Sequence, residues 1–285
     1  MDEKIPMSQR IPPKDRGSGK KFLVEVTPGM EIITVSNQKG GVGKTTTCVN
    51  LAAELGKLGY SVLVVDMDPQ ANCTSGLGLA PKEFQLSIYD VLLGEAEPGE
   101  ALLATKWKGV TAIPSTIDLA GAEIELASLI SRETKLRRRI RLLDGFDVAV
   151  VDCPPSLGML TINALVASNR LIIPIQCEYY ALEGVGQLSK TIRLVKDSLN
   201  SELEISGVLL TMFDSRTRLS AEVAEEVRRQ FGSLAFNTVI PRNVRLSEAP
   251  SHGEPIGYYD PSSAGAKAYE DLAREVSKLW LKGGR

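Results

Sequence analysis

The feature that most constrains this chain is a glycine-rich loop set between a β-branched run and a helical pattern. The run at residues 32–35 leads into the loop at 36–43, which reads SNQKGGVG, and apolar residues then recur at helical spacing up to Leu58. Backbone N–H groups of such a loop, together with the positive end of the following helix, form a cradle for phosphate groups. Lys44 and Thr45 follow the loop directly, where a lysine reaches terminal phosphates and a hydroxyl suits a magnesium ion. The sequence therefore predicts a phosphate-binding strand–loop–helix unit.

The loop departs from the usual phosphate-loop pattern at one position. Gln38 stands where the pattern has its first glycine, five residues before Gly43. Lys39 comes next, so the loop carries a second lysine in addition to Lys44. Two ammonium groups on one loop repel each other unless a strongly anionic ligand lies near both. We expect Lys39 to serve such a ligand; the alternative is a lysine that only contacts solvent.

Acidic residues stand at the ends of two further apolar runs. The run 62–65 is followed by Asp66 and Asp68, and the run 148–151 is followed by Asp152. Because the carboxyl ends of parallel strands meet at one edge of a sheet, these side chains are expected to face the crevice beside the loop. A carboxylate at such a strand end holds Mg²⁺ in many nucleoside triphosphatases. Asp66 taken alone has an alternative role as the cap of a following helix.

Short apolar runs alternate with amphipathic stretches from residue 31 onward. The runs are continuous and mostly β-branched, as in strands buried on both faces, and they lie at residues 32–35, 62–65, 148–151, 171–175, 208–210 and 238–240. This alternation predicts an α/β fold with three αβα layers around a mostly parallel twisted sheet. No long linker or internal repeat interrupts residues 29–285, so we expect one domain there.

Residues 1–28 have the composition of a flexible arm. They contain four prolines and two glycines that break regular structure, and residues 1–21 carry six Lys and Arg against three Asp and Glu. The segment has no apolar stretch of the kind found in a secretory signal, and it is too short for a helix-turn-helix domain. We expect a solvated arm; the alternative is a weak contact with DNA or a partner.

The chain as a whole is close to neutral, with 33 Lys and Arg against 35 Asp and Glu and a formal charge of −2. Any nucleic-acid binding must therefore come from a local patch. The four cysteines are too few and too scattered for a disulfide framework, and no apolar run approaches the roughly 18 residues of a membrane span. We expect a cytoplasmic protein with reduced thiols.

Taken together, the segments above make this chain resemble the ParA/Soj family of partition ATPases, which have a deviant Walker A loop. The resemblance covers residues 30–280 and rests on KGGVGKT (39–45), DMDPQ (66–70), DCPPS (152–156), QCEYYALE (176–183), LLTMFDSRT (209–217) and IPRNVRLSEAP (240–250). The loop is typical of the wider MinD/ParA superfamily of P-loop NTPases. The later segments are similar to the chromosomal Soj type.

The resemblance implies an ATPase that uses ATP and Mg²⁺ and forms an ATP-dependent sandwich homodimer. Lys39 would reach the nucleotide of the other subunit and Asp68 would orient the attacking water, so these two are the expected catalytic residues. Thr45 and Asp152 would hold the metal. The expected nucleotide-binding residues are Lys39, Gly40, Gly41, Val42, Gly43, Lys44, Thr45 and Thr46, with Pro241 and Asn243 at the adenine.

The resemblance also implies two macromolecular partners. Arg216 and Arg245 match arginines that the family uses to hold double-stranded DNA without reading its sequence. A ParB-like centromere-binding protein would stimulate an otherwise slow hydrolysis. The expected task is segregation of a chromosome or plasmid, with the protein associated with the nucleoid.

Two rival functions stay open at this stage. A MinD-like ATPase would act on a membrane through its last helix, here residues 268–280, whose apolar side carries Leu272, Val276, Leu279 and Trp280. A membrane-surface helix should have a cationic polar face, whereas acids and bases balance here, so we expect this helix to pack on the core and we expect no membrane partner. The other rival positions a different cargo on the nucleoid and would share every site residue named above.

Three further features have ordinary explanations. The basic stretch 135–141 has Leu136 and Ile140 on one helical face, which favours a surface helix, although it could extend a DNA-binding surface. Cys153 lacks the paired cysteine segment that the cluster of a nitrogenase iron protein needs. His252, the only histidine, has no nearby nucleophile to activate.

Overall fold

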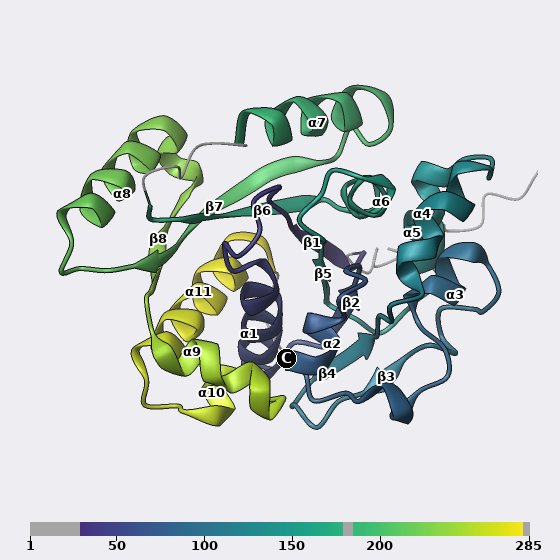
Figure 1. Ribbon diagram of the computed structural model, residues 1–285, viewed down its shortest axis with the longest axis horizontal. Coiled ribbons are helices and arrows are strands. Elements are labelled where there is room, and N and C mark those ends of the chain that lie inside the picture. The colour runs from purple at the N-terminus through teal and green to yellow at the C-terminus, as the bar shows by residue number, and fades with distance from the viewer. Residues whose placement is uncertain (1–28, 179–184, 282–285) are drawn as a thin grey trace, which may run out of the picture.

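In the part of the chain that the structure describes, one eight-stranded sheet runs through the centre (Figure 1). The computed structural model describes residues 29–178 and 185–281, so the predicted arm at 1–28 and part of the segment 176–183 lie outside it. The strands are β1 (Glu31–Val35), β2 (Val62–Asp66), β3 (Leu103–Ala104), β4 (Val110–Ile113), β5 (Val148–Asp152), β6 (Arg170–Gln176), β7 (Glu204–Phe213) and β8 (Ala235–Pro241). Their order is β3-β4-β2-β5-β1-β6-β7-β8, and every pairing is parallel except that of β3 with β4.

Helices cover both faces of this sheet. One face is covered by α1 (Lys44–Lys57), α2 (Asn72–Gly76), α10 (Ile256–Tyr259) and α11 (Ala264–Trp280). The other face is covered by α3 (Ile88–Leu93), α4 (Leu119–Ala127), α5 (Lys135–Ile140), α6 (Met159–Ala167), α7 (Val185–Ser198) and α8 (Arg218–Phe231). Figure 1 shows α1 and α11 side by side beneath the sheet. The predicted three-layer α/β fold is confirmed.

The central strands are buried on both faces, which is why their sequences are continuous apolar runs. Ile33 and Val35 point into the core under α1 and α11, whereas Ile32 points into the core under α3 to α6. The same alternation holds in β2, where Val64 and Val65 belong to opposite cores. Successive side chains of a strand point to opposite faces of the sheet. A strand between two helical layers therefore needs apolar residues at both odd and even positions.

Strand register brings the predicted site to one edge. In the β2–β5 pairing Asp66 lies opposite Asp152, and in the β1–β5 pairing Val35 lies opposite Asp152. The loop that follows β1 therefore leaves the sheet directly beside both carboxylates. This edge is formed by the carboxyl ends of parallel strands, where ligands of open α/β sheets bind.

The last helix packs on the protein core. In α11, Leu272 and Val276 are fully buried, and the Tyr269 hydroxyl lies 3.3 Å from Thr47 Oγ1 of α1. The prediction was wrong for Leu279, which is 59% exposed and lies off the buried side of the helix, whereas Trp280 packs against Phe236 of β8. None of the helices within residues 29–178 and 185–281 has the length and apolarity needed to cross a membrane.

Candidate functional site

Two glycines give the loop after β1 its shape. Gly41 and Gly43 have φ angles of 73° and 90°, in the left-handed region that a side chain disfavours, and Gly43 is the residue before α1. Between them Val42 is buried, and its carbonyl accepts a hydrogen bond of 2.9 Å from the Thr211 hydroxyl at the end of β7. On the other side of the loop, the buried Asn37 donates to the Pro174 carbonyl at 2.7 Å. The loop is thus attached to β6 and β7.

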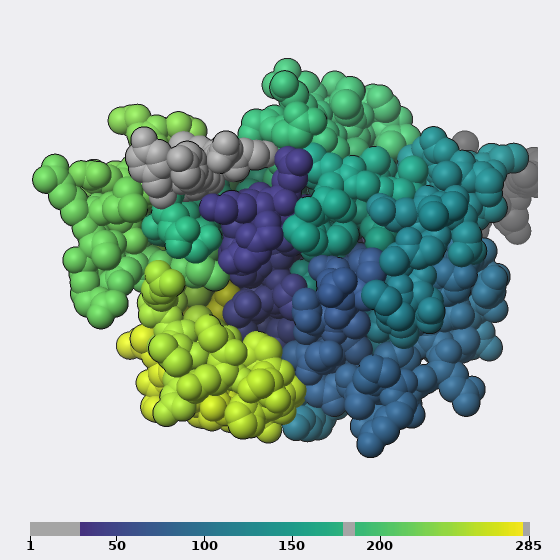
Figure 2. Space-filling model, viewed as in Figure 1, coloured from purple at the N-terminus to yellow at the C-terminus, as the bar shows by residue number. Residues whose placement is uncertain are grey.

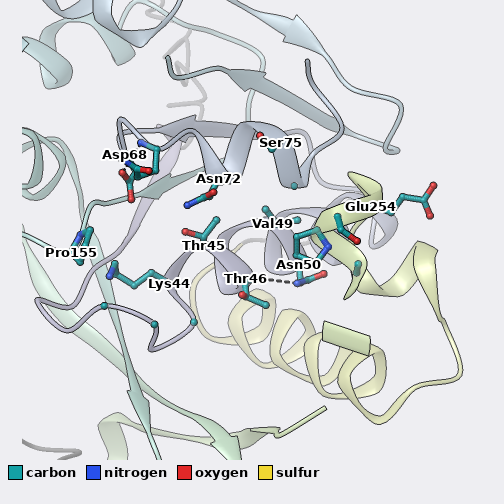
Figure 3. A pocket seen from close by; sticks show the side chains of 18 of the residues that line it. Lys44, Thr45, Thr46, Val49, Asn50, Asp68, Asn72, Ser75, Pro155 and Glu254 are labelled. Carbon is teal, nitrogen blue, oxygen red and sulfur yellow. Dashed lines mark hydrogen bonds between the residues drawn. The ribbon is translucent and has the colours of Figure 1, made fainter. Parts of the chain in front are cut away.

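A cavity of about 580 Å³ opens beside this loop. Its lining begins at Gly40, Gly41, Gly43, Lys44, Thr45 and Thr46 and continues with Val49, Asn50, Asp68, Gln70, Asn72, Ser75, Gly76, Pro155, Met212, Ala249, Pro250, Ser251 and Glu254. Figure 3 shows Lys44, Thr45 and Asp68 around one end of it and Asn50 and Glu254 at the other. In the space-filling view the purple amino-terminal segment reaches the surface between the blue and yellow-green segments (Figure 2).

The two loop lysines differ in their surroundings. Lys44 is 6% exposed, and its ammonium donates to the Lys39 carbonyl at 3.2 Å. Burial lowers the pKa of Lys44, while the neighbouring Asp152 opposes that shift. Lys39 is partly exposed and is not among the residues that line the cavity, and its backbone N–H donates to the Asn37 side chain at 3.1 Å. Lys44 is therefore placed to meet an anionic ligand in the cavity, whereas contact of Lys39 with such a ligand stays a prediction.

Asp152 is fully buried, and one of its two carboxylate oxygens lacks a hydrogen-bond partner among the described residues. Oδ1 is 3.5 Å from the Cys48 sulfur, and Oδ2 has no hydrogen-bond partner among the described residues. Burial and the adjacent Asp66 raise the pKa of Asp152 to about 8, although the Thr45 hydroxyl favours its ionised form. A buried oxygen without a partner is costly unless a proton or a cation completes it.

Asp66 does not face the crevice, so this prediction was wrong. One carboxylate oxygen accepts from the backbone N–H and the hydroxyl of Thr74 at 2.8 and 2.7 Å, and the other accepts from the Asp68 N–H at 3.1 Å. Burial raises the pKa of Asp66 to about 6, and the Thr74 hydrogen bonds lower it. Thr74 in turn accepts a hydrogen bond of 2.9 Å from the Ser115 N–H. Asp66 therefore holds the segment 66–74 in place.

Asp68 lines the cavity at its loop end, and Glu254 is the acid at the other end. It is 7% exposed, and Oδ1 accepts a hydrogen bond of 3.0 Å from the Gln70 N–H. Its position beyond the end of β2 places it across the cavity from Lys44, as Figure 3 shows. A carboxylate at this place can accept a hydrogen bond from a water in the cavity.

The donor set fits Mg²⁺. The Thr45 hydroxyl and the Asp152 carboxylate are hard oxygen ligands, and Oδ2 of Asp152 lacks any other partner in the described part of the chain. Within residues 29–178 and 185–281 no three His, Cys, Asp or Glu side chains gather to hold a metal unaided. Mg²⁺ at phosphate sites takes one or two protein oxygens and completes its shell with water and phosphate oxygens.

The far wall of the cavity was not anticipated from the sequence. Met212, Ala249, Pro250, Ser251 and Glu254 line it. Met212 has a φ angle of 52°, an unusual value for a residue with a side chain. The segments LLTMFDSRT and IPRNVRLSEAP, which contain Met212 and residues 249–250, were the available signal for this wall.

Pro241 and Asn243 do not line the cavity among the described residues. Pro241 ends β8 opposite Phe213, next to the cavity residue Met212. The Asn243 side chain accepts a hydrogen bond of 2.8 Å from the Arg245 N–H and so caps α9 (Val244–Glu248). Their contact with adenine stays a prediction.

The two arginines expected to contact DNA lie on the surface outside the cavity. Arg216 follows β7 and its side chain is 84% exposed, and Arg245 in α9 is 54% exposed. In the basic helix α5, Leu136 and Ile140 are buried, which confirms the predicted surface helix. The four cysteines are buried free thiols, and His252 stacks on Tyr259 with ring centroids 4.9 Å apart.

Comparison with known proteins gives consistent results. A family profile described as an AAA domain matches residues 30–205. Over 248 residues, which are 87% of this chain and 98% of the relative, the chain is 56% identical to the sporulation initiation inhibitor protein Soj of Bacillus subtilis. It is 51% identical to the chromosome-partitioning ATPase Soj of Treponema pallidum, covering 84% of this chain and 94% of that protein.

A solved structure with the same fold carries a nucleotide. Cobyrinic acid a,c-diamide synthase from Mycobacterium smegmatis, with bound ADP and magnesium, superimposes with a TM-score of 0.78 at 41% identity. The match covers 90% of this chain and 97% of that one. The name of that protein denotes another reaction. Its sequence identity to this chain, 41%, is lower than that of the two Soj proteins, 56% and 51%.

Proposed function

This chain belongs to the Soj/ParA family of chromosome-partitioning ATPases, and on that premise we propose that it binds Mg-ATP in the cavity beside the loop, dimerises around it and holds DNA. The observation that carries the proposal is that Lys44 and Asp68 line the cavity at the edge of the sheet where β5 ends in Asp152, whose Oδ2 has no hydrogen-bond partner among the described residues. A cation, a carboxylate facing water and a metal ligand are what phosphoryl transfer to water requires. ATP and Mg²⁺ are the cofactors of the reaction.

The loop and its lysines are assigned to the phosphates. Backbone N–H groups of the lining residues between 40 and 46 would donate to the phosphates, with the positive end of α1 behind them. Lys44 balances the charge that develops on the terminal phosphate oxygens. Lys39 is partly exposed and outside the cavity lining, so it is assigned to the nucleotide bound by a second copy of the chain.

Thr45 and Asp152 are assigned to the metal, which when bound neutralises phosphate charge. Asp68 is assigned to the attacking water. Its carboxylate would accept a hydrogen bond from the water O–H and so align the water oxygen with the terminal phosphate. No arginine lies among the residues that line the described cavity. We therefore expect slow turnover alone and stimulation by a ParB-like partner that adds cationic stabilisation.

Asp68→Ala tests the role of the water-orienting acid. Without the carboxylate the water is not aligned, so we expect ATP turnover to fall by at least about 100-fold, the usual size of such a contribution. Binding of ATP and ATP-dependent dimerisation should persist, because the phosphate contacts remain. Turnover by phosphate release and dimerisation by light scattering check both parts. A variant that hydrolyses ATP at the parent rate contradicts the assignment.

DNA association with ATP, with ADP and without nucleotide tests the proposed function as a whole. Duplexes of unrelated sequence at two salt concentrations serve as ligands, and Lys44→Ala serves as the control that cannot hold the phosphates. We expect binding that needs ATP, ignores sequence and weakens steeply with salt. Binding that is absent with every nucleotide contradicts a DNA partner.

The membrane alternative has a separate test. The apolar side of α11 is buried through Tyr269, Leu272 and Val276, which leaves no continuous apolar face for a bilayer in this element. Cosedimentation with anionic liposomes in ATP is expected to be absent. Cargo other than DNA is distinguished by the protein that copurifies with the ATP-bound form.

A further inference from the structure

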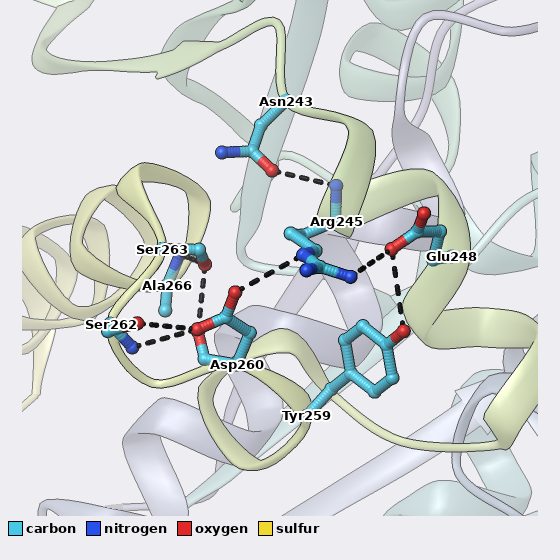
Figure 4. Close-up of polar contacts among 8 residues, drawn as sticks. All are labelled: Asn243, Arg245, Glu248, Tyr259, Asp260, Ser262, Ser263 and Ala266. Atoms are coloured by element: carbon cyan, nitrogen blue, oxygen red, sulfur yellow. Dashed lines mark hydrogen bonds and ion pairs between the residues drawn. The ribbon is translucent and has the colours of Figure 1, made fainter.

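Arg245 is held between two carboxylates. Its Nη1 donates to Glu248 Oε2 at 2.8 Å, and its Nε is 3.4 Å from Asp260 Oδ2 (Figure 4). Glu248 lies three residues along the same helix, whereas Asp260 comes from the turn after α10. The guanidinium thus bridges two segments of the surface.

Both carboxylates are themselves held in place. The other oxygen of Asp260 accepts hydrogen bonds from the Ser262 N–H at 3.2 Å and from the Ser262 hydroxyl at 2.7 Å. The Tyr259 hydroxyl donates to Glu248 at 3.4 Å. Because the acids are positioned by other groups, the ion pairs do not depend on two free side chains meeting by chance, and less entropy is lost in forming them.

Arg216 has the same kind of partner. Its Nε and Nη2 donate to the two oxygens of Asp214 at 2.9 and 2.7 Å, and its backbone N–H donates to Asp214 at 3.0 Å. These bonds lower the pKa of Asp214 to about 2, so the carboxylate is charged throughout the physiological range. Both arginines expected to contact DNA are therefore paired with acids of their own chain.

We propose that Glu248, Asp260 and Asp214 are competing carboxylates that set the DNA affinity by occupying Arg245 and Arg216 in the free protein. A carboxylate presents two oxygens to the guanidinium fork in the same way as a phosphate does, so DNA must displace it. The inference rests on the proposed DNA contacts of these arginines. Competition from these carboxylates makes a single protomer a weak DNA binder. The gain in DNA affinity on dimerisation is then larger, because two protomers contact the same duplex.

A double-mutant cycle tests the proposal at Arg245. The acids are neutralised in Glu248→Gln/Asp260→Asn, which keeps side-chain size and the oxygen acceptors for Tyr259 and Ser262. DNA binding by the full chain with a non-hydrolysable ATP analogue should tighten roughly three- to tenfold, the range of two partly exposed ion pairs. On the Arg245→Ala background the same two substitutions should not increase DNA affinity, because the guanidinium for which the acids and DNA compete is absent.

The matched control neutralises two acids whose arginines have no assigned DNA contact. Glu226 pairs with Arg229 in α8, and Glu270 pairs with Arg274 in α11. Glu226→Gln/Glu270→Gln makes the same change in net charge. A gain as large in this control, or a gain that persists on the Arg245→Ala background, shows a general charge effect and overturns the proposal.

The failure of the proposed function gives a different pattern. If Arg245→Ala binds DNA as tightly as the parent, the DNA contact itself is wrong, and the inference falls with it. If Arg245→Ala weakens binding but the neutralised acids leave the parent affinity unchanged, only the competition is refuted. Unchanged thermal unfolding midpoints establish that each variant is folded.

Discussion

At the scale of single residues, the site is dominated by buried charge. Asp66 and Asp152 lie opposite each other on neighbouring strands, and burial raises the pKa of each, to about 6 and about 8. An acid whose folded-state pKa is raised binds its proton more tightly in the folded state than in the unfolded state. Its contribution to stability is complete below the unfolded pKa near 4 and is lost as the pH rises through the folded pKa.

Asp152→Asn is therefore expected to stabilise the metal-free and nucleotide-free protein at high pH. The amide cannot ionise, so the variant escapes the loss that the parent suffers between about pH 4 and pH 8. Its advantage in free energy of unfolding should grow by at least about 1.4 kcal/mol from pH 5 to pH 8, the equivalent of one pKa unit. Urea unfolding in chelator at several pH values measures it, with the exposed Asp144→Asn as control. Parallel pH curves for parent and Asp152→Asn contradict this account.

The sequence predicted the loop and its lysines because their chemistry depends on neighbours in the chain. It predicted the wrong direction for Asp66, because the position of Thr74 depends on the turn that starts α2. It gave no indication that Glu248 and Asp260 share Arg245, since that contact depends on how α9 and α10 are placed. Both the Asp66–Thr74 contact and the Arg245–Asp260 ion pair follow from the fold.

At the scale of elements, the strands that could be predicted are those with a continuous apolar run. Two strands were missed: in β4 the polar Thr111 interrupts the apolar run, and β3 has two residues and pairs antiparallel at the edge of the sheet. A two-residue segment is too short for a period to be recognised. The helix α1 was predictable from its apolar spacing, yet its close approach to a neighbouring loop was not.

That approach is made by Gly56 of α1. A Cβ at this position would lie 2.0 Å from the Lys108 carbonyl oxygen, which belongs to the backbone. Gly56→Ala should lower the free energy of unfolding by about 1–3 kcal/mol through overpacking, although alanine favours a helix by about 1 kcal/mol. In α4, Gly121→Ala meets only the end of the flexible Glu125 side chain at 3.4 Å and should be neutral or stabilising. The denaturant midpoints of the two variants measure the difference in stability. Equal effects of Gly56→Ala and Gly121→Ala would contradict this account.

A second element connects the nucleotide cavity with the surface. The helix α9 carries Arg245 and continues into the 3₁₀ turn Ala249–His252, where residues 249–251 line the cavity. One short segment thus touches the proposed nucleotide site at one end and the proposed DNA contact at the other. The hydrogen bond from Thr211 to Val42 makes a similar link between the loop and β7, the strand that leads to Arg216.

At the scale of the whole molecule, a formal charge of −2 means that the proposed DNA binding has to depend on a few local contacts. Each phosphate contact contributes about −0.9 to the slope of log K against log salt concentration on duplex DNA. Because the proposed ATP-bound form has two subunits, one arginine in the sequence supplies two contacts.

Arg216→Ala should therefore make that slope less steep by about 2, one contact from each subunit. Affinity for all duplexes should fall alike, because a phosphate contact carries no sequence information. Titrations at four salt concentrations with the ATP analogue measure the slope, and Arg274→Ala on α11 is the control. A slope that equals that of the parent would place the DNA surface elsewhere, with α5 the next segment to test.

The cavity takes its walls from distant parts of the chain, and this affects when it can first be formed. Residues 40–76 supply the loop side, residues 249–254 supply the opposite wall, and α11 packs on the helix that follows the loop. During translation the loop emerges long before the other two, and a domain folds as a unit once its parts are present. A chain still on the ribosome therefore carries the glycine loop without an enclosed site. The proposed nucleotide binding, and with it the proposed pairing of subunits, therefore has to wait until residues 249–280 have been synthesised.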